Sequence, residues 1–579
     1  MRSSWQLAAV AATGAAAAIL NQRDDSQSWA SSSIVEAEET VYVTDWTTLY
    51  TTICPTTSES QPLSTSPAAV SPSTTSATYV SSSSAAANTQ VGHSSWGTAG
   101  LGCFPKWLPK ADGSQYTSAP WGDLTTTNSD ATVLGDIPTT NVTRYYNFTI
   151  TRGVLSPDGV ERDVMLVNGQ FPGPAVEANW GDILHITVNN EIYNPTEGTS
   201  LHWHGMLQKK TPWYDGVPAI GQCPIAPGHS FTYIFQAELY GTSWYHAHYS
   251  AQYTAGIVGP MMIYGPSQVD YDCDVGPVML SDWYHDPYFT IVENVVGTDI
   301  AVIPPTSDSN LINGRNNFTC SDATYDNGTY YVASNVNSSL NTYICKEGAP
   351  LSQFKFQAGK THRLRIINHG ADGVQKFRID GLNMTVISLD YVPVVPYTTD
   401  VVTVGIAQRI DVVVTAPKDT TASYWMRAED VGSVTCGGSK VPLALAAIFN
   451  EDADTSVMPT STPSFYLNDT ICDVTMPYTT PEYPITPSTA SFQQDLAITL
   501  TTNSTGNFEW RLNNQSFRAN FNHPILFMAA EGNVSYPYDP QWNVYNFNQN
   551  TSVIFNLTNN TPVSSSFHGR LFRSKLTHQ

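Results

Sequence analysis

Charged side chains are scarce in this sequence. Only 13% of its 579 residues are Asp, Glu, Lys or Arg, and 26 basic residues face 49 acidic ones, which gives a formal net charge of −23. A surface of this sign repels phosphate, so nucleic acid is excluded as a partner. The low charge, together with 38 glycines and 37 prolines, argues against coiled coils and long solvent-facing helices and favours turn-rich β structure.

Long apolar runs are missing beyond the first residues. Residues 1–20 combine one arginine with a short Ala-rich apolar run, which is typical of a cleavable signal peptide and too short to span a bilayer. The alternative, a buried helix, would offer mostly alanine for packing. No later stretch supplies about 18 uncharged apolar residues, so we expect a soluble, secreted protein without a membrane partner. Thirteen Asn-x-Ser/Thr sequons agree with export as a glycoprotein.

Closely spaced cysteines are also absent. The eight cysteines are far apart and form no C-x-x-C pair. In an exported chain this pattern favours disulfides over metal ligation. The spacing does not fix the connectivity, although Cys320 and Cys345 bracket a sequon-rich loop and are candidates to pair.

The amino-acid composition differs between the N-terminal segment and the rest of the chain. Residues 21–100 are dominated by Ser, Thr and Ala, which cannot bury enough apolar surface to offset the entropy of ordering, so we expect a disordered, O-glycosylated stalk. A plain spacer is the simpler function for such a stalk, and cell-wall association is the alternative. Further along, short segments alternate apolar and polar residues between Gly, Pro, Asn and Asp turns, which predicts β-sandwiches over 137–266, 267–460 and 461–579. In THRLRIIN the same alternation predicts that Arg363 and Arg365 point outward.

Histidine is sparse, yet four of the 13 histidines form two close pairs. His202 and His204 are two residues apart, as are His246 and His248. In a strand, residues i and i+2 face the same side about 6.5–7 Å apart, so each pair presents two imidazoles in one direction. Imidazole suits copper, zinc, iron and nickel. One such pair is more often incidental, but two pairs in one predicted sandwich, both flanked by aromatic residues, predict a metal centre.

The sequence around these pairs resembles the multicopper oxidases, and the fungal laccases in particular. The resemblance is carried between residues 144 and 563 by LHWHG, DGVPAIGQCPIAPG, GTSWYHAHYSAQYTAGIVGPMMIYG, VNGQFPGPAVEANWGD, SDWYH, SNLINGR, AGKTHRLRIIN and WRLNNQSFRANF. It implies an all-β fold of three consecutive cupredoxin-like Greek-key β-sandwiches, with the third incomplete in this sequence. It also implies copper as the cofactor. His202 would bind the type 2 copper, and His204, His246 and His248 would supply half of the ligands of the type 3 pair.

Two acids receive roles from the same resemblance. Asp215, in the DGVP segment, resembles the residue that feeds protons to dioxygen at the copper cluster. Asp282, in SDWYH, resembles a substrate-pocket carboxylate that accepts the proton of a phenol. The alternative for Asp282 is a strand-end aspartate that makes local hydrogen bonds. The remaining histidines are expected to be structural or solvated.

The sequence departs from the family pattern near its C-terminal end. The family takes four more cluster histidines from the last domain, and two histidines and a cysteine for the type 1 copper. After Ser564 only His568 and His578 remain, and the last cysteine is Cys472. Residues 565–579 are basic in an acidic protein, so we expect them to be foreign to the fold, as from a frame shift or a retained intron.

Three functions therefore compete. The first is a monomeric, laccase-like oxidase that couples one-electron oxidation of a phenolic substrate to reduction of dioxygen to water. The second is a truncated, non-catalytic, copper-binding secreted glycoprotein. The third is a ferroxidase- or ascorbate-oxidase-type member of the family. Because the sequence offers no type 1 site for electron entry, we expect the chain as written not to oxidise substrate.

Overall fold

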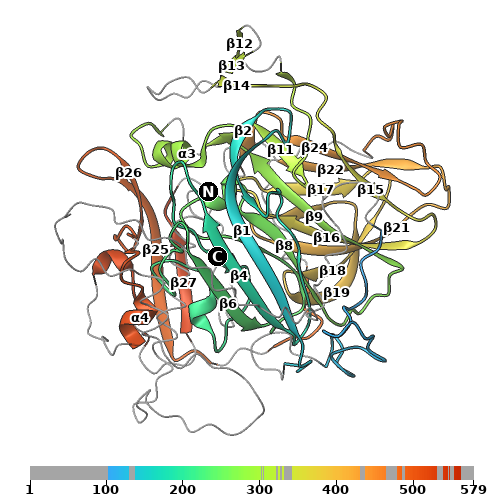
Figure 1. Cartoon of the computed structure of the whole chain (residues 1–579), viewed down its shortest axis with the longest axis horizontal. Coiled ribbons are helices and arrows are strands. Elements are labelled where there is room, and N and C mark those ends of the chain that lie inside the picture. Colours follow the sequence, from blue (N-terminus) through green and yellow to red (C-terminus); the bar gives the residue numbers. More distant parts are fainter. Residues whose placement is uncertain are drawn as a thin grey trace, which may run out of the picture.

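The fold is taken from a computed structural model of the whole chain. The structure describes residues 102–128, 137–300, 303, 305–320, 324–326, 329–331, 342–430, 437–463, 479–485, 489–518, 520–530, 539–545, 547 and 553–561. The predicted signal peptide and stalk lie outside these residues, as do His568, His578 and Cys472. Within them, strands dominate and helices are short, so the all-β prediction is confirmed (Figure 1).

The first sandwich consists of two four-stranded sheets, ordered β2-β1-β4-β6 and β3-β8-β7-β5. In β4, buried and partly exposed side chains alternate, as the sequence pattern predicted. Its apolar side chains, with those of the facing sheet, form the largest buried core of the molecule, centred on Trp180 and Trp203. The strands are β1 (Thr143–Leu155), β2 (Arg162–Val167), β3 (Val176–Asn179), β4 (Ile183–Glu191), β5 (Leu201–Trp203), β6 (Ser230–Gln236), β7 (Gly241–Ala247) and β8 (Val258–Tyr264).

The second sandwich pairs a six-stranded sheet, β11-β9-β16-β21-β18-β19, with a five-stranded sheet, β15-β24-β22-β17-β20. A second large core fills the space between them, with Phe356 and Phe377 fully buried. The strands are β9 (Cys273–Trp283), β11 (Ser309–Ile312), β15 (Ser352–Lys355), β16 (Thr361–Asn368), β17 (Gln375–Ile379), β18 (Met384–Leu389), β19 (Val392–Thr399), β20 (Val402–Val404), β21 (Arg409–Thr415), β22 (Ser423–Asp430) and β24 (Leu443–Phe449).

The third region contributes a three-stranded sheet, β26-β25-β27, over a small core that includes Leu496 and Trp510. The short helix α4 lies near this sheet, and α3 lies between the second and third regions (Figure 1). Small sheets join β10 to β23 and β12 to β13 and β14. The remaining elements are β25 (Phe492–Thr502), β26 (Phe508–Leu512), β27 (Val553–Asn559), β10 (Thr306–Ser307), β23 (Gly438–Ser439), β12 (Thr324–Asp326), β13 (Thr329–Tyr331), β14 (Thr342–Tyr343), α3 (Tyr288–Val295), α4 (Ile525–Ala530) and the 3-10 helices η1 (Pro212–Tyr214), η2 (Gln252–Ala255) and η6 (Pro540–Trp542).

The prediction that Arg363 and Arg365 point outward is wrong. Both guanidinium groups are buried, and Arg365 is 1% exposed. Arg365 donates to both carboxylate oxygens of Asp274 and to Thr242 Oγ1 of β7, and Arg363 pairs with Asp411. Their face of β16 is covered because it packs against the first sandwich. The prediction assumed that one face of the sheet containing β16 meets solvent, but both faces of β16 are covered.

Two disulfides are described. Cys320 pairs with Cys345, which confirms the candidate pairing, and Cys103 pairs with Cys273 at the start of β9. The second bridge ties residues 102–128, which received no role from the sequence, to the second sandwich. The same segment reaches the first sandwich through Asn179, whose side chain bonds both backbone groups of Leu108.

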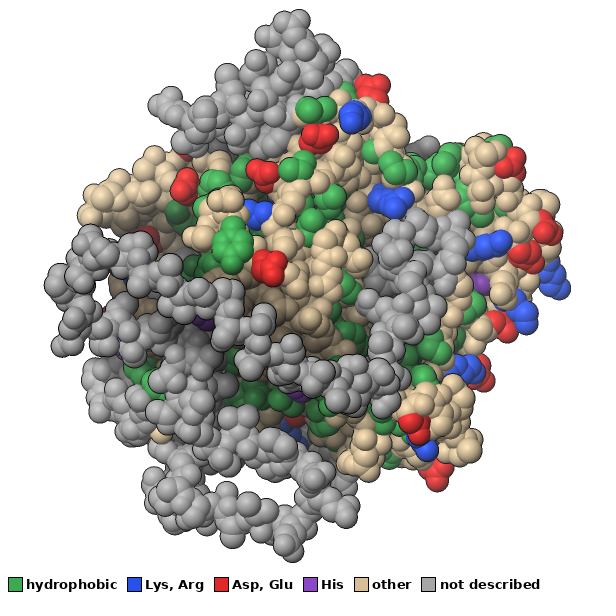
Figure 2. Space-filling view, viewed as in Figure 1, with side chains coloured by type: hydrophobic (Ala, Val, Ile, Leu, Met, Phe, Trp, Pro, Cys, Tyr) green, Lys and Arg blue, Asp and Glu red, His purple; other side chains and the backbone are tan. Residues whose placement is uncertain are grey.

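The surface agrees with the sparse charge of the sequence. On the face shown in Figure 2, acidic and basic side chains are few among polar and apolar ones, and several of them lie together along the right-hand edge. In the described part of the chain, no helix is long and apolar enough to cross a membrane.

Candidate metal centre

The two histidine pairs lie at the edge of one sheet of the first sandwich. Strands β5 and β7 are antiparallel neighbours, and their register places His202 directly opposite His246. His204 and His248 each follow the last residue of their strand. The strand geometry assumed from the sequence therefore holds for the first histidine of each pair. The second member lies where the backbone turns, next to Gly205 with a positive φ in the first case.

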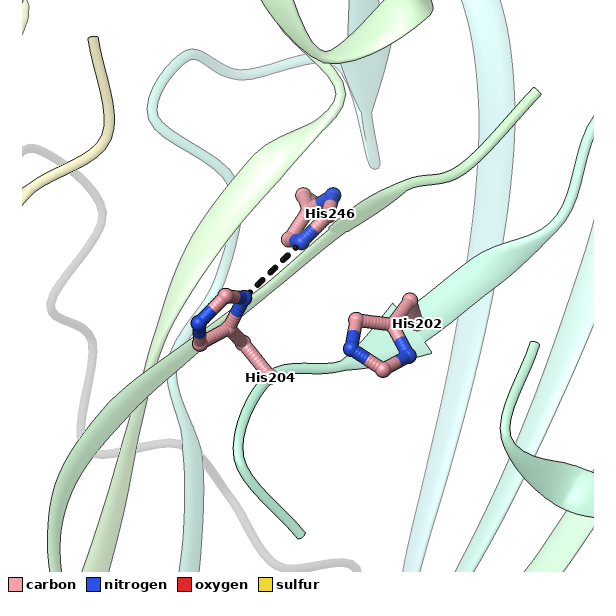
Figure 3. Close-up of side chains that lie close together, drawn as sticks. All are labelled: His202, His204 and His246. Carbon is pink, nitrogen blue, oxygen red and sulfur yellow. Dashed lines mark hydrogen bonds between the residues drawn. The ribbon is translucent and has the colours of Figure 1, made fainter. Parts of the chain in front are cut away.

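The histidines converge. Ligand nitrogens of His202, His204 and His246 lie within 4.8 Å of one another, and His204 Nδ1 is 3.2 Å from His246 Nε2 (Figure 3). The ring centroid of His248 is 5.5 Å from that of His202 and 5.9 Å from that of His246. Pairing of β5 with β7 therefore turns two sequence pairs into one cluster of four imidazoles.

Asp215 contacts His202 through two groups. Its carbonyl oxygen is 2.6 Å from His202 Nδ1, and its carboxylate Oδ1 is 3.4 Å from the same nitrogen. With a proton on Nδ1 the ring donates to the carbonyl oxygen, which leaves Nε2 as the unprotonated nitrogen that binds metals. The loop that carries Asp215 is pressed onto β5, because Ser200 Oγ donates to Gly216 O at 2.7 Å.

Trp244 supports two of the rings. It stacks on His204 with centroids 5.2 Å apart and on His246 with centroids 4.2 Å apart. His246 Nδ1 is 3.0 Å from the carbonyl oxygen of Ala247, a contact that orients the ring. Trp244 was not singled out from the sequence. Its signal was available, since Trp244, His246 and His248 share the two-residue spacing that places side chains on one face of a strand.

Burial favours the neutral form of the His248 imidazole. The pKa of His248 is lowered to about 4, first because the ring is withdrawn from water and second because His202 is close. His246 is 8% exposed. A buried ring that stays neutral at pH 7 presents a lone pair, which is the form that coordinates a cation.

Asp282 lies at the end of β9 and is buried. Its carboxylate accepts the backbone N–H groups of Ala371, Asp372 and Gly373 at 2.6–2.9 Å. Burial raises its pKa, and these three bonds partly oppose that rise. These bonds join residues 89 to 91 positions apart in the sequence, so they are structural but not the local bonds of the alternative. The substrate role of Asp282 stays a prediction.

The donor set suits copper. Three imidazole nitrogens within 4.8 Å, with rings oriented by carbonyl oxygens and an indole, form a nitrogen-rich site without thiolate or described carboxylate ligands. Zinc, iron and nickel also suit imidazole ligands, so the donor set alone restricts the metal to these four.

Comparisons with known proteins point to one protein family. Two family models, both described as multicopper oxidase, match residues 149–268 and 274–453. Laccase-2 of Botryotinia fuckeliana is 37% identical over 415 residues, which cover 71% of this chain and 65% of that protein. Dihydrogeodin oxidase of Aspergillus terreus is 43% identical over 285 residues, 49% of this chain and 44% of that protein. The chain thus spans less than two thirds of the length of these relatives.

Solved structures agree with the sequence matches. The laccase from Botrytis aclada is 33% identical, with a TM-score of 0.61 over 72% of this chain and 73% of that chain. Fet3p, described as a multicopper oxidase that functions in iron import, is 26% identical, with a TM-score of 0.54 over 65% of each chain. These matches confirm the cupredoxin-like sandwiches inferred from the sequence. On the strength of both family models and of these relatives, this chain belongs to the multicopper oxidase family.

Proposed function

We propose that this protein is a laccase-like oxidase, which couples four one-electron oxidations of a phenolic substrate to the four-electron reduction of dioxygen to water. The observation that carries the proposal is the convergence of His202, His204 and His246 within 4.8 Å on two paired strands. Relatives named laccase support the phenolic substrate. Because the chain spans 65% of Laccase-2, activity of the whole protein is part of the proposal.

The four histidines would hold copper, with His202 at the type 2 position and the other three at the type 3 pair. Copper supplies one-electron redox chemistry when bound. The protein's part is orientation and protonation. Asp215 O fixes the proton of His202 on Nδ1, and the Asp215 carboxylate, 3.4 Å from that nitrogen, would hold a proton next to the cluster. Asp282 would accept the proton of the phenol.

The surrounding organisation is proposed on the same basis. We infer a secreted, monomeric glycoprotein with sandwiches over 137–266, 267–460 and 461–579, preceded by a Ser/Thr-rich stalk. The Cys103–Cys273 and Cys320–Cys345 disulfides support an oxidising compartment, since such bridges are rare in the cytosol.

Copper binding without turnover is the second candidate. It is favoured by the fact that the described histidine cluster comes entirely from β5, β7 and the residues just after them. Such a cluster can hold an ion without donors from another region. Oxidation of ferrous iron is a third outcome, because Fet3p is described as functioning in iron import.

The test is a copper titration of the full chain followed by electron paramagnetic resonance and oxygen-uptake assays. We expect Cu(II) to bind with nitrogen hyperfine structure, and His246→Gln to weaken binding by at least about tenfold because a ligand is lost. The matched control, His185→Gln, changes a histidine on β4 whose ring contacts Tyr145 instead of the cluster. Oxygen uptake with a diphenol supports the oxidase and overturns the expectation that the chain as written does not oxidise substrate, and uptake with ferrous iron alone favours the third outcome. Copper binding without uptake favours the second candidate, and equal binding by both variants would refute the site.

A further inference from the structure

The segment Asn520–Ala530, from the third region, contacts the chain beside both histidine pairs. It contains Phe521 and the short helix α4. Neither residue type nor spacing marks this segment as functional, and it carries no proposed copper ligand. Its contacts fall on two loops of the first sandwich that lie far from it in the sequence.

The first contact holds the loop that follows Asp215. Ile525 and Met528 of α4 pack with Val217 and Ile220 in a separate buried cluster. Two backbone bonds reinforce this packing, from Ile525 N–H to Ala219 O at 3.1 Å and from the next residue to Ile220 O at 3.0 Å. The first N–H groups of a helix have no partner within the helix, so α4 uses its own end to fasten the loop.

The fastened loop leads to His202. Asp215 at its start receives the His202 ring on its carbonyl oxygen. Gly216 lies so close to β5 that a Cβ there would fall 1.7 Å from Leu201 O. A shift of the loop therefore moves either the Asp215 carbonyl or the strand that carries His202.

The second contact lies beside the other pair. Phe521 stacks on Tyr249, with ring centroids 5.0 Å apart and an interplanar angle of 26°. Tyr249 directly follows His248, where β7 has already ended and no ladder fixes the backbone. A turn bond from Gln252 N–H to Tyr249 O, at 3.2 Å, holds the backbone there, and the Phe521 ring adds a contact from the third region to this turn.

We propose that Asn520–Ala530 is a brace that positions His202 and His248 for metal binding, with Phe521, Ile525 and Met528 as its positioning residues. This inference rests on the proposed copper site. It makes the histidine geometry of the first sandwich depend on a segment of the third. Groups that orient metal ligands from outside typically change metal affinity by about 10- to 100-fold when removed.

The experiment uses the full chain and five variants. Met528→Ala and Phe521→Ala remove the two contacts, and Met528→Leu and Phe521→Tyr are their conservative partners. Leu512→Ala is the matched control, because Leu512 is buried in the third region in a cluster that lacks both loops. Hydrogen exchange of the metal-free protein is measured for the peptides 212–223 and 246–252, and the dissociation constant for Cu(II) is measured by titration.

We expect Met528→Ala to speed exchange in 212–223 and Phe521→Ala to speed it in 246–252, with Cu(II) bound about tenfold more weakly in each. The conservative variants and Leu512→Ala should match the parent in both measurements. Unchanged exchange would overturn the brace, as would faster exchange with unchanged copper affinity, or an equal effect of Leu512→Ala. If the parent chain binds no copper, the proposed function fails, and exchange alone decides whether the brace exists.

Discussion

Asp282, at the end of β9, fastens the turn formed by residues 371–373. Its carboxylate accepts three consecutive backbone N–H groups, from Ala371, Asp372 and Gly373. Asp282→Asn keeps the shape but points an amide NH₂ at donors, so we expect the free energy of unfolding to fall by about 2–4 kcal/mol in urea. Asp454→Asn, at an exposed turn, should lower the free energy of unfolding much less. Equal costs would show that the three bonds contribute little.

A second carboxylate predicts a pH dependence. Asp272 accepts from the backbone N–H and hydroxyl of Thr361 and from Lys360, and these bonds lower its pKa from 3.8 to about 2. Because the folded pKa lies below the unfolded one, the stabilisation is present above pH 4 and is lost as the pH falls towards 2. Asp272→Asn should therefore lower Tm at pH 5 and approach the parent as the pH is lowered. A difference in Tm between Asp272→Asn and the parent that stayed constant with pH would contradict the assignment.

Single residues also show the limits of sequence reasoning. The four histidines were identified because two close pairs are rare, and the structure brings them together. Arg365 was misplaced because alternation reports only that a strand has two different faces. Whether the polar face of β16 meets water or a buried carboxylate such as Asp274 depends on what packs against the strand, and the alternation within one strand does not contain that information.

The loop after β5 contains a glycine that no other residue replaces easily. Gly216 has a φ of +80°, and a Cβ there meets the Leu201 carbonyl oxygen at 1.7 Å. Gly169 is the matched control, with a φ of +73° and nothing within 4 Å of a Cβ. Gly169→Ala should cost about 1 kcal/mol from backbone strain alone, and Gly216→Ala at least about 2 kcal/mol more, measured by urea unfolding. Similar costs would mean that the loop yields freely.

Single strands were predicted better than the pairing between strands. Apolar and polar residues alternate along β1, β4, β6 and β16, since each of these strands turns one face towards a core. The adjacency of β5 and β7, on which the cluster depends, follows from long-range pairing that no local signal encodes. The brace formed by Asn520–Ala530 was missed for the same reason.

The two described disulfides close loops of very different length. Cys103–Cys273 joins residues 170 apart in sequence, and Cys320–Cys345 joins residues 25 apart. On loop entropy alone these bridges stabilise by about 5 and about 3.5 kcal/mol. We expect the double alanine variant of the longer bridge to lose more stability in guanidinium than that of the shorter one. The reverse order would show that local strain or residual unfolded structure dominates.

For the whole molecule, the sequence pattern predicted the all-β class, and the resemblance of the motifs predicted the multicopper oxidase family. Periodicity and turn residues sufficed for β-sandwiches, because each strand carries its own two-residue signal. Residues 102–128 escaped notice because they lack such a signal, although they contact both sandwiches through Cys103 and Leu108.

The placement of the cluster on β5 has an evolutionary consequence. β5 is three residues long and lies at the edge of its sheet, in the order β3-β8-β7-β5. Trp203 faces the core from this strand and is fully buried, whereas His202 on the other face is partly exposed. We therefore expect inward substitutions on β5 to impair folding and outward ones to change the metal centre while the sandwich stays folded. Selection for a stable fold then acts on Trp203, and selection for metal binding acts on His202.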